Sequence, residues 1–361
     1  MGLRGILAML AGMATAAAHA QAVQANQGGQ GVHVERPPQF VMLAFDNCTE
    51  LDRWRDLADF SAEMNRDGER LRFTFFVSGV NFIEDASRGA YRGPGQRRGY
   101  SRINFGGSAD DVRRRVDYVN ALFAQGHEIA SHAIGHFDGA RWSAAQWEQE
   151  FGAYRGIIEN SASPGMRAGT ARLDVPLAKI VGFRAPYLAA GAGLYEALRR
   201  GGFRYDTSGI SFADQWPQKR DAIWRFNLAR LRIAGLGRAT LSMDYNFVVA
   251  QSGGRVDARR AETFKAQMLA TYHAYFRTSY TGNRAPLHIG HHFEAYQGGA
   301  YHAALKEFAR QVCGLPEVRC AAYSELADFM DGQSPEMLAA YQRGDFSHAA
   351  LPIAAAAARA P

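Results

Sequence analysis

Four short apolar segments, far apart in the chain, each end in or beside a residue suited to acid–base chemistry or metal binding. They are 40–47, ending in Asp46 and Asn47; 128–132, ending in His132; 181–187, with Arg184 and Tyr187; and 287–291, ending in His291. The parallel strands of a (β/α) barrel bring the side chains at their carboxyl ends to one mouth. The pattern therefore predicts a hydrolytic metalloenzyme site assembled from distant stretches of sequence.

Strand and helix patterns alternate from Gln39 onward, which favours a parallel sheet covered by helices in one α/β domain. The expected strands are 39–46, 71–77, 127–132, 180–184, 203–207, 239–245, 286–291 and 319–323. The expected helices are 51–67, 110–125, 143–160, 192–201, 258–277 and 300–313. Ser143 and Gln146 have the spacing of a capping box at the start of one helix.

The two ends of the chain depart from this alternation. Residues 1–20 combine Arg4, an apolar stretch and an A-x-A pattern at 18–20, which is the arrangement of a signal peptide. Residues 21–38 read as a flexible leader and 333–361 as a C-terminal extension with an Ala-rich tail. We therefore expect an exported protein, periplasmic or secreted. An uncleaved anchor is the alternative, although the apolar stretch is short and rich in Ala and Gly.

The charge balance bears on the kind of partner. The formal net charge is +6 and the isoelectric point is near 9.3, which suits an anionic partner such as a cell-envelope polymer. Many of the arginines lie in 88–115, but no aromatic-interleaved RNA or DNA motif supports a nucleic-acid partner. We expect no nucleic-acid partner and no stable membrane insertion; a plain solvated surface is the alternative interpretation of the arginines.

Three cysteines become informative if the protein is exported. Cys313 and Cys320 flank six residues and can close one small loop as a disulfide; two reduced, buried thiols are the alternative. Cys48 is left over, two residues after Asp46. We expect a small core residue there, with a soft metal ligand or a redox-sensitive thiol as the less favoured interpretations.

Two long segments, 81–109 and 209–238, lack a regular pattern. Loops of this length in a compact domain are usually functional or disordered. The second contains Phe212 and Trp216, whose rings would be able to stack on sugars at a barrel mouth. Packing of the loops over the barrel is the competing interpretation for each ring.

His132 and His136 leave a predicted strand four residues apart. Two neutral imidazoles that converge on one side suit Zn²⁺, Co²⁺ or Ni²⁺. A chance pair is the alternative, because the chain has eleven histidines.

Asp46 ends a buried strand, where a carboxylate is unfavourable unless a metal or a cation lies nearby. Arg184, also at a strand end, would be that cation and would keep Asp46 ionised. A structural Asp–Arg pair without a catalytic role is the alternative. After Arg184, Pro186 fixes a turn that can aim the backbone N–H of Tyr187 at a developing oxyanion.

Side-chain alternation decides between two neighbouring histidines in the last segment. If Leu287 and Ile289 face the barrel interior, His291 lies at the mouth. His292 then faces away as a packed or surface histidine.

Together these segments resemble the polysaccharide deacetylases of carbohydrate esterase family 4, over most of residues 39–332. The resemblance also draws on the motif 74–77 after the second strand. The segments 183–188, 285–287 and 323–326 are most similar to the chitin-deacetylase-like branch. It implies a single distorted (β/α) barrel with long mouth loops over 39–332.

The resemblance further implies metal-dependent removal of N-acetyl groups from a polysaccharide containing N-acetylglucosamine, with Zn²⁺ favoured over Co²⁺ or Ni²⁺. The implied roles are Asp46 as general base, His132 and His136 as metal ligands, Arg184 orienting Asp46, Tyr187 in the oxyanion hole, and His291 as general acid. The Asp that polarises this histidine in the family matches Asp244, with Asp206 as the alternative.

One departure concerns the metal. The family has a second Asp where this chain has Asn47. An amide oxygen can coordinate a metal or orient a water, but it adds no negative charge, so metal affinity should fall. Three alternatives therefore stay open: a non-catalytic glycan-binding protein with a decayed site, an O-acetyl esterase on xylan-type glycans, and, less favoured, a small-molecule amidase. The sequence does not choose between peptidoglycan, chitin oligomers and other acetylated glycans, and it leaves the oligomeric state open.

Overall fold

Strand β1, Gln39–Asp46, is buried along its whole length and pairs in parallel with three other strands. These partners are β11 Leu287–His292, β2 Phe73–Val77 and β12 Val318–Cys320. A strand with apolar side chains on both faces requires a layer on each side. The predicted bounds of β1 are confirmed.

The computed structural model describes residues 34–159 and 172–347. The main sheet has the order β11-β1-β2-β3-β4-β5-β8-β7, and β12 pairs with β1 beside it. Its remaining strands are β3 Glu128–Ser131, β4 Gly182–Phe183, β5 Tyr205–Asp206, β7 Gln218–Arg220 and β8 Ile223–Arg225. All of its pairs are parallel except β7 with β8.

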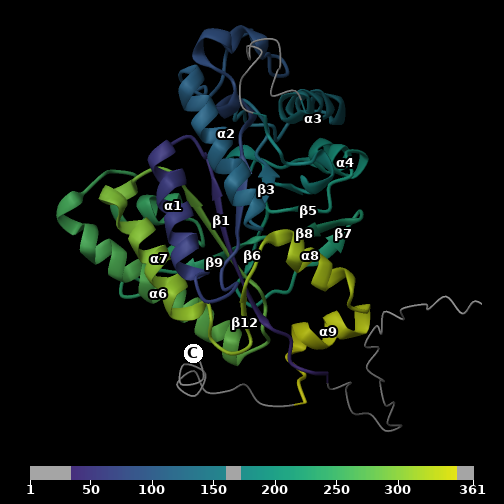
Figure 1. Ribbon diagram of the computed structural model, residues 1–361. Coiled ribbons are helices and arrows are strands. Elements are labelled where there is room, and N and C mark those ends of the chain that lie inside the picture. The colour runs from purple at the N-terminus through teal and green to yellow at the C-terminus, as the bar shows by residue number, and fades with distance from the viewer. Residues whose placement is uncertain (1–33, 160–171, 348–361) are drawn as a thin grey trace, which may run out of the picture. The chain divides into compact units, whose positions relative to one another are not determined.

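A second, three-stranded sheet has the order β10-β9-β6. Its strands are β6 Ile210–Phe212, β9 Leu228–Arg232 and β10 Ala239–Leu241. Met243, just after β10, forms a parallel bridge with Gly290 on β11. The second sheet therefore meets the first beside β11, which gives the predicted distorted (β/α) barrel (Figure 1).

Helices surround these strands (Figure 1). They are α1 Leu51–Met64, α2 Ala109–Ala124, α3 Ala144–Glu159, α4 Ala192–Arg200, α5 Asp244–Ser252, α6 Ala261–Thr281, α7 Ala300–Val312, α8 Tyr323–Asp331 and α9 Pro335–Arg343. Short 3₁₀ helices lie at η1 Gly79–Phe82, η2 Asp85–Ala90, η3 Leu177–Lys179, η4 Pro186–Leu188, η5 Ala258–Arg260 and η6 Tyr296–Gly299. The predicted capping box is confirmed, because the Ser143 N–H donates to Gln146 Oε1 at 2.9 Å and the Gln146 N–H donates to Ser143 Oγ at 3.3 Å. Within 34–159 and 172–347, none of the helices has the length and apolar character needed to cross a membrane.

The segment 209–238, predicted to be irregular, contains β6, β7, β8 and β9. Strands of three to five residues are too short for alternation to show in a sequence. The strand predicted over 239–245 ends at Leu241, and Asp244 begins helix α5.

Alternating residues of β1 enter two different cores. Val41, Leu43 and Phe45 pack toward the covering helices, in one cluster with Leu287 and Ile289 of β11. The other face of β1, which includes Met42 and Ala44, packs inside the barrel with Tyr205 and Tyr323. The prediction that Leu287 and Ile289 face the barrel interior is therefore wrong.

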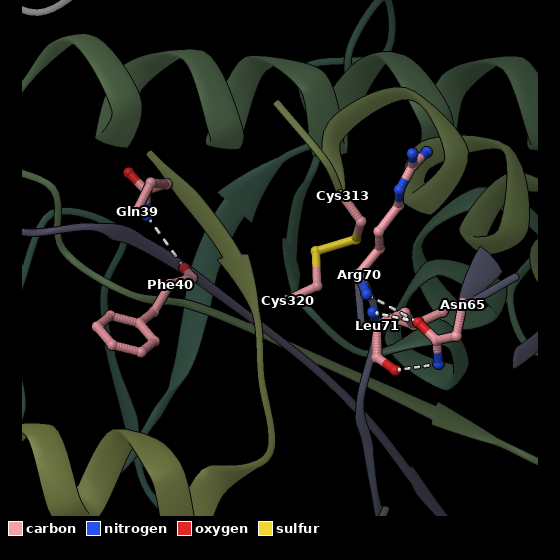
Figure 2. Close-up of a disulfide and its surroundings, with 7 residues drawn as sticks. All are labelled: Gln39, Phe40, Asn65, Arg70, Leu71, Cys313 and Cys320. Carbon is pink, nitrogen blue, oxygen red and sulfur yellow. Dashed lines mark hydrogen bonds between the residues drawn. A yellow bond between two sulfur atoms is a disulfide. The ribbon is translucent and has the colours of Figure 1, made fainter. Parts of the chain in front are cut away.

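Cys313, directly after α7, and Cys320, in β12, form the predicted disulfide (Figure 2). Beside it, the Asn65 side chain that follows α1 accepts hydrogen bonds from the backbone N–H groups of Arg70 and Leu71 (Figure 2). Together these contacts join α1, α7 and the sheet at the end opposite the carboxyl ends of the strands. Cys48 is a free, buried cysteine.

The predicted C-terminal extension packs against the barrel through α9. Tyr341 of α9 lies 5.0 Å from Trp216, ring centroid to ring centroid. Val34, at the end of the predicted leader, forms a parallel bridge with Phe346. The predicted signal peptide, the rest of the leader to residue 33 and the Ala-rich tail lie outside the described residues.

Candidate active site

Asp46 lies at the carboxyl end of β1, and its side chain is almost completely buried. Arg184 follows β4, is fully buried, and donates from Nη1 to Asp46 Oδ2 at 3.3 Å. Arg184 Nε also donates to Thr207 Oγ1 at 2.8 Å, and the guanidinium lies 4.4 Å from the Phe76 ring centroid. The structure thus brings together the Asp–Arg pair expected from the sequence.

A glycine on β11 makes room for this arginine. A Cβ atom on Gly290 would lie 3.2 Å from Arg184 Nη1 and 2.9 Å from Met243 Cε. Both distances are shorter than ordinary van der Waals contact, so any side chain at this position would displace the guanidinium or Met243.

His292, and not His291, is the histidine beside Asp46. His292 Nε2 lies 3.2 Å from Asp46 Oδ1, and His292 Nδ1 hydrogen-bonds Asp244 Oδ1 at 2.6 Å. Asp46 and His292 are register partners on the parallel strands β1 and β11, so their side chains share one face. The predicted orientation of the two histidines is reversed in the structure.

His291 faces the helix layer instead. It is fully buried, its Nε2 hydrogen-bonds Tyr272 Oη of α6 at 2.9 Å, and its Nδ1 lies 3.7 Å from Asp244 Oδ2. Burial lowers the pKa of His291 to about 4, so the ring is neutral near pH 7. The prediction failed because it placed Leu287 and Ile289 inside the barrel, whereas they pack with His291 against the helices.

Asp46 and His292 each stabilise the ionised form of the other. Burial acts to raise the pKa of Asp46, but His292 and Arg184 outweigh it and lower that pKa to about 2. Burial acts to lower the pKa of His292, but Asp46 and Asp244 outweigh it and raise that pKa to about 10. A carboxylate therefore faces an imidazolium at neutral pH.

Asp244, the first residue of α5, binds this imidazolium at Nδ1, the ring nitrogen that does not face Asp46. The backbone N–H groups of Tyr245 and His292 donate to its carboxylate at 2.7 and 2.8 Å. Asp206, the alternative from the sequence, instead accepts from Ser208 Oγ at 2.6 Å. We call Asp46, Arg184, His292 and Asp244 the acid–base group.

His132 and His136, here called the histidine pair, lie on the turn after β3. Their ring centroids are 5.1 Å apart. His132 Nδ1 is 2.7 Å from the carbonyl oxygen of Arg184. Because a carbonyl only accepts, the proton is assigned to Nδ1, which leaves the Nε2 lone pair available to a metal.

The turn that carries the histidine pair is held in an unusual conformation. Ala133 and His136 have φ values of 58° and 54°, in the left-handed region that is uncommon for residues other than glycine. Glu150 of α3, which the sequence did not single out, accepts the backbone N–H groups of Ile134 and Gly135 at 3.0 and 3.2 Å. These two hydrogen bonds hold the backbone between His132 and His136.

Asn47 follows Asp46 with φ of 49°. Its Nδ2 donates to Glu294 Oε1, while its Oδ1 is buried without a hydrogen-bond partner among the described residues. Burial raises the pKa of Glu294 to about 7, and this carboxylate also interacts with the charge of His292. Glu294 was missed because no strand ends there and no motif contains it.

The donor atoms fit a divalent ion only with an uncharged third ligand. Within 34–159 and 172–347, no three His, Cys, Asp or Glu side chains converge as a metal site. The histidine pair and the unpartnered Oδ1 of Asn47 would supply two imidazoles and one amide oxygen, a set that Zn²⁺, Co²⁺ or Ni²⁺ accepts. Cys48 Sγ instead contacts the carbonyl oxygen of Phe76 at 3.8 Å, as a core residue would.

Tyr187 lies within the single-turn helix η4, with φ of 58°. Its ring centroid is 4.7 Å from that of His136, and 60% of the residue is exposed. As the second residue of a one-turn helix, it has a backbone N–H without an acceptor inside the turn. Among the described residues this N–H donates to no backbone carbonyl outside the turn.

The two aromatic residues predicted to bind sugar differ. Trp216 is 2% exposed, donates from Nε1 to the Asn283 carbonyl at 2.8 Å, and packs on Tyr341. The prediction for Trp216 is wrong, because the C-terminal extension covers the ring. Phe212 of β6 is 68% exposed and remains a candidate.

Known protein folds give a comparison for this geometry. No profile of a known protein family and no curated protein matches the chain. A solved structure from Mycobacterium smegmatis, provisionally named a polysaccharide deacetylase, matches with a TM-score of 0.52 at 16% identity, over 89% of this chain and 98% of that one. This chain has the polysaccharide deacetylase fold.

Two further structures with this fold are more distant. The Xyl-CE4 domain of a xylanase from the hindgut metagenome of Trinervitermes trinervoides has a TM-score of 0.44 at 15% identity, over 83% of this chain and 94% of that one. A CE4 family pseudoenzyme from Bacillus anthracis has a TM-score of 0.42 at 8% identity, over 83% and 70%. Likenesses this distant do not bear on the activity of the present chain.

Proposed function

We propose that the protein is an exported, metal-dependent hydrolase that removes N-acetyl groups from a polysaccharide containing N-acetylglucosamine. The observation that carries the proposal is the acid–base group, in which a buried Asp46 lies between Arg184 and a histidine backed by Asp244. Hydrolysis of an amide requires a base for the attacking water and an acid for the departing nitrogen, and this group contains one of each.

Asp46 is the general base of the proposed reaction. Its Oδ1 is buried, lies 3.2 Å from His292 Nε2 and makes no hydrogen bond among the described residues, so this oxygen would accept the proton of the water. The contact of Arg184 with Oδ2 fixes the carboxylate orientation and keeps it ionised.

His292 is the general acid. Its Nε2 proton lies on the side of Asp46, while Nδ1 is bound to Asp244, so the ring is both oriented and charged. Delivery of that proton to the sugar nitrogen would contribute about 10²–10⁴-fold to the rate. The products are acetate and a free amine on the glycan.

The backbone N–H of Tyr187 would donate to the developing oxyanion, and loss of one such donor typically costs about 3–4 kcal/mol of transition-state stabilisation. The histidine pair and Asn47 would hold the divalent ion, for which Zn²⁺ is favoured over Co²⁺ or Ni²⁺. The chemistry expected of such an ion is Lewis-acid polarisation of the acetyl carbonyl.

A panel of acetylated polymers tests this function. Purified protein supplied with Zn²⁺ or Co²⁺ is assayed for acetate release from chitin oligomers, peptidoglycan and O-acetylated xylan. Release from the N-acetylated substrates supports the proposal, and release from xylan alone would replace it with an O-acetyl esterase. The uncharged Asn47 favours one further candidate, a non-catalytic glycan-binding protein, which predicts glycan binding without acetate release.

A further inference from the structure

The orientation of the Asn47 amide is fixed by the carboxylate beside it. A carboxylate only accepts hydrogen bonds when ionised, so the amide must present Nδ2 to Glu294 Oε1. Its Oδ1 therefore points away from Glu294. That oxygen is buried and has no hydrogen-bond partner in the described part of the chain.

The second carboxylate oxygen of Glu294 is in the same situation. Oε2 is also buried and without a hydrogen-bond partner within 34–159 and 172–347. Native proteins rarely leave buried polar atoms unpaired, and such atoms often mark the place of an ion or a water. Asn47 and Glu294 thus share a single hydrogen bond and leave two buried oxygens, Asn47 Oδ1 and Glu294 Oε2, without hydrogen-bond partners among the described residues.

The surrounding charges favour a cation there. Asp46 and Asp244 contact the cations Arg184 and His292, so these four side chains pair with one another. Glu294 adds a third carboxylate, and its side-chain hydrogen bond among the described residues is with the Asn47 amide.

We propose that Glu294 supplies, through Asn47, the negative charge that the candidate metal site lacks. This inference rests on the proposed function, because it presumes that the histidine pair binds a divalent ion. A carboxylate that accepts the amide N–H polarises the amide, so its oxygen becomes a stronger donor to a cation. Glu294 is therefore a positioning residue that acts through Asn47 and does not itself bind the ion.

The pair offers a charge-swap experiment. Glu294→Gln removes the charge and keeps the side-chain shape, whereas the double variant Asn47→Asp/Glu294→Gln returns one carboxylate and one amide with their positions exchanged. His132→Ala removes a proposed ligand, and Glu336→Gln, on the exposed face of α9, is the matched control. Full-length proteins are freed of metal and titrated with Co²⁺, by calorimetry and by the visible absorption of bound Co²⁺.

We expect Glu294→Gln to weaken Co²⁺ binding about 10–100-fold, the usual effect of losing a partner that supports a metal ligand. The double variant should bind at least as tightly as the unchanged protein, with an altered Co²⁺ spectrum because a carboxylate replaces the amide. Glu336→Gln should bind normally. Melting temperatures identify any variant that fails to fold.

The opposite results are equally informative. Normal Co²⁺ binding by Glu294→Gln, together with loss of binding by His132→Ala, would overturn the inference and leave the metal site of the proposed function standing. A double variant as weak as Glu294→Gln would also overturn it, because charge returned through Asn47 would have no effect. Absence of Co²⁺ binding by the unchanged protein would overturn both the inference and the metal dependence of the proposed function.

Discussion

The two halves of the candidate site differ in how their side chains are paired by charge. In the acid–base group, two carboxylates and two cations form a continuous set of contacts between 2.6 and 3.3 Å, although Asp46 Oδ1 and Arg184 Nη2 make no hydrogen bond among the described residues. In the metal half, formed by the histidine pair and Asn47, His136 Nδ1 and Asn47 Oδ1 are buried without hydrogen-bond partners in the described part of the chain. The charges of the first half meet one another, whereas the second half offers imidazole and amide atoms to a cation. The difference implies that the two halves can be disabled separately.

The largest effect should come from the centre of the acid–base group. Asp46→Asn keeps the shape of the side chain but removes the base, and it also removes the charge that holds His292 protonated. We expect acetate release to fall about 10³–10⁴-fold, near the upper end for general acid–base catalysis. Co²⁺ affinity, measured in parallel, should change only a few-fold. Equal loss of both would show that the two halves are not separable.

The neighbouring histidines give the next test. His292→Asn should lower kcat about 10²–10³-fold because it removes the proton donor. His291→Asn should leave kcat within a few-fold but reduce the free energy of unfolding by about 1–3 kcal/mol, since the Tyr272 hydroxyl loses its buried partner. Steady-state kinetics and denaturant unfolding of both variants separate the roles. The reverse pattern would restore His291 as the acid.

A carboxylate introduced into the metal half should sharpen the contrast. Asn47→Asp adds a negative charge at a proposed ligand, so Zn²⁺ or Co²⁺ should bind on the order of 10-fold more tightly. The gain is limited because Glu294, a second carboxylate, accepts the amide N–H at that position. Calorimetric titration measures the change. Unchanged affinity would place Asn47 outside the set of ligands.

The smallest effect concerns stability and pH in metal-free protein. The folded-state pKa of His292, about 10, lies above its ordinary value of 6.5. Its charge therefore contributes stability that is fully present below pH 6.5 and is lost as the pH rises toward 10. The melting temperature should fall by on the order of a few degrees over this window. Asp244→Asn should flatten that pH dependence; a slope equal to that of the unchanged protein would contradict the pairing.

Elements with strong patterns were predictable from sequence. The bounds of β1 and the positions of α1, α2 and α7 followed from a continuous apolar run and from helical periodicity. The short strands of 209–238 carry too few residues for either pattern. The capping box of Ser143 and Gln146 was predictable because it depends on two residues only three positions apart in the sequence.

The site was only partly predictable, because register and distant packing are not local. His292 shares a face with Asp46 through the pairing of β1 with β11, which no single segment reveals. Trp216 is covered by Tyr341, more than a hundred residues later in the chain. Only one indirect sequence signal pointed to Glu294. Position 47 holds an uncharged Asn, so the negative charge expected at the metal site had to come from another residue.

Gly290 carries a consequence for how this site tolerates change. Glycine has no side chain that could bind a ligand, so from the sequence alone this position would be expected to accept any small residue. Yet a methyl group there would meet the same Arg184 nitrogen that contacts Asp46, as well as the flexible end of Met243. Alanine at 290 would therefore press on the partner of the base by a few tenths of an ångström, without adding or removing any polar atom.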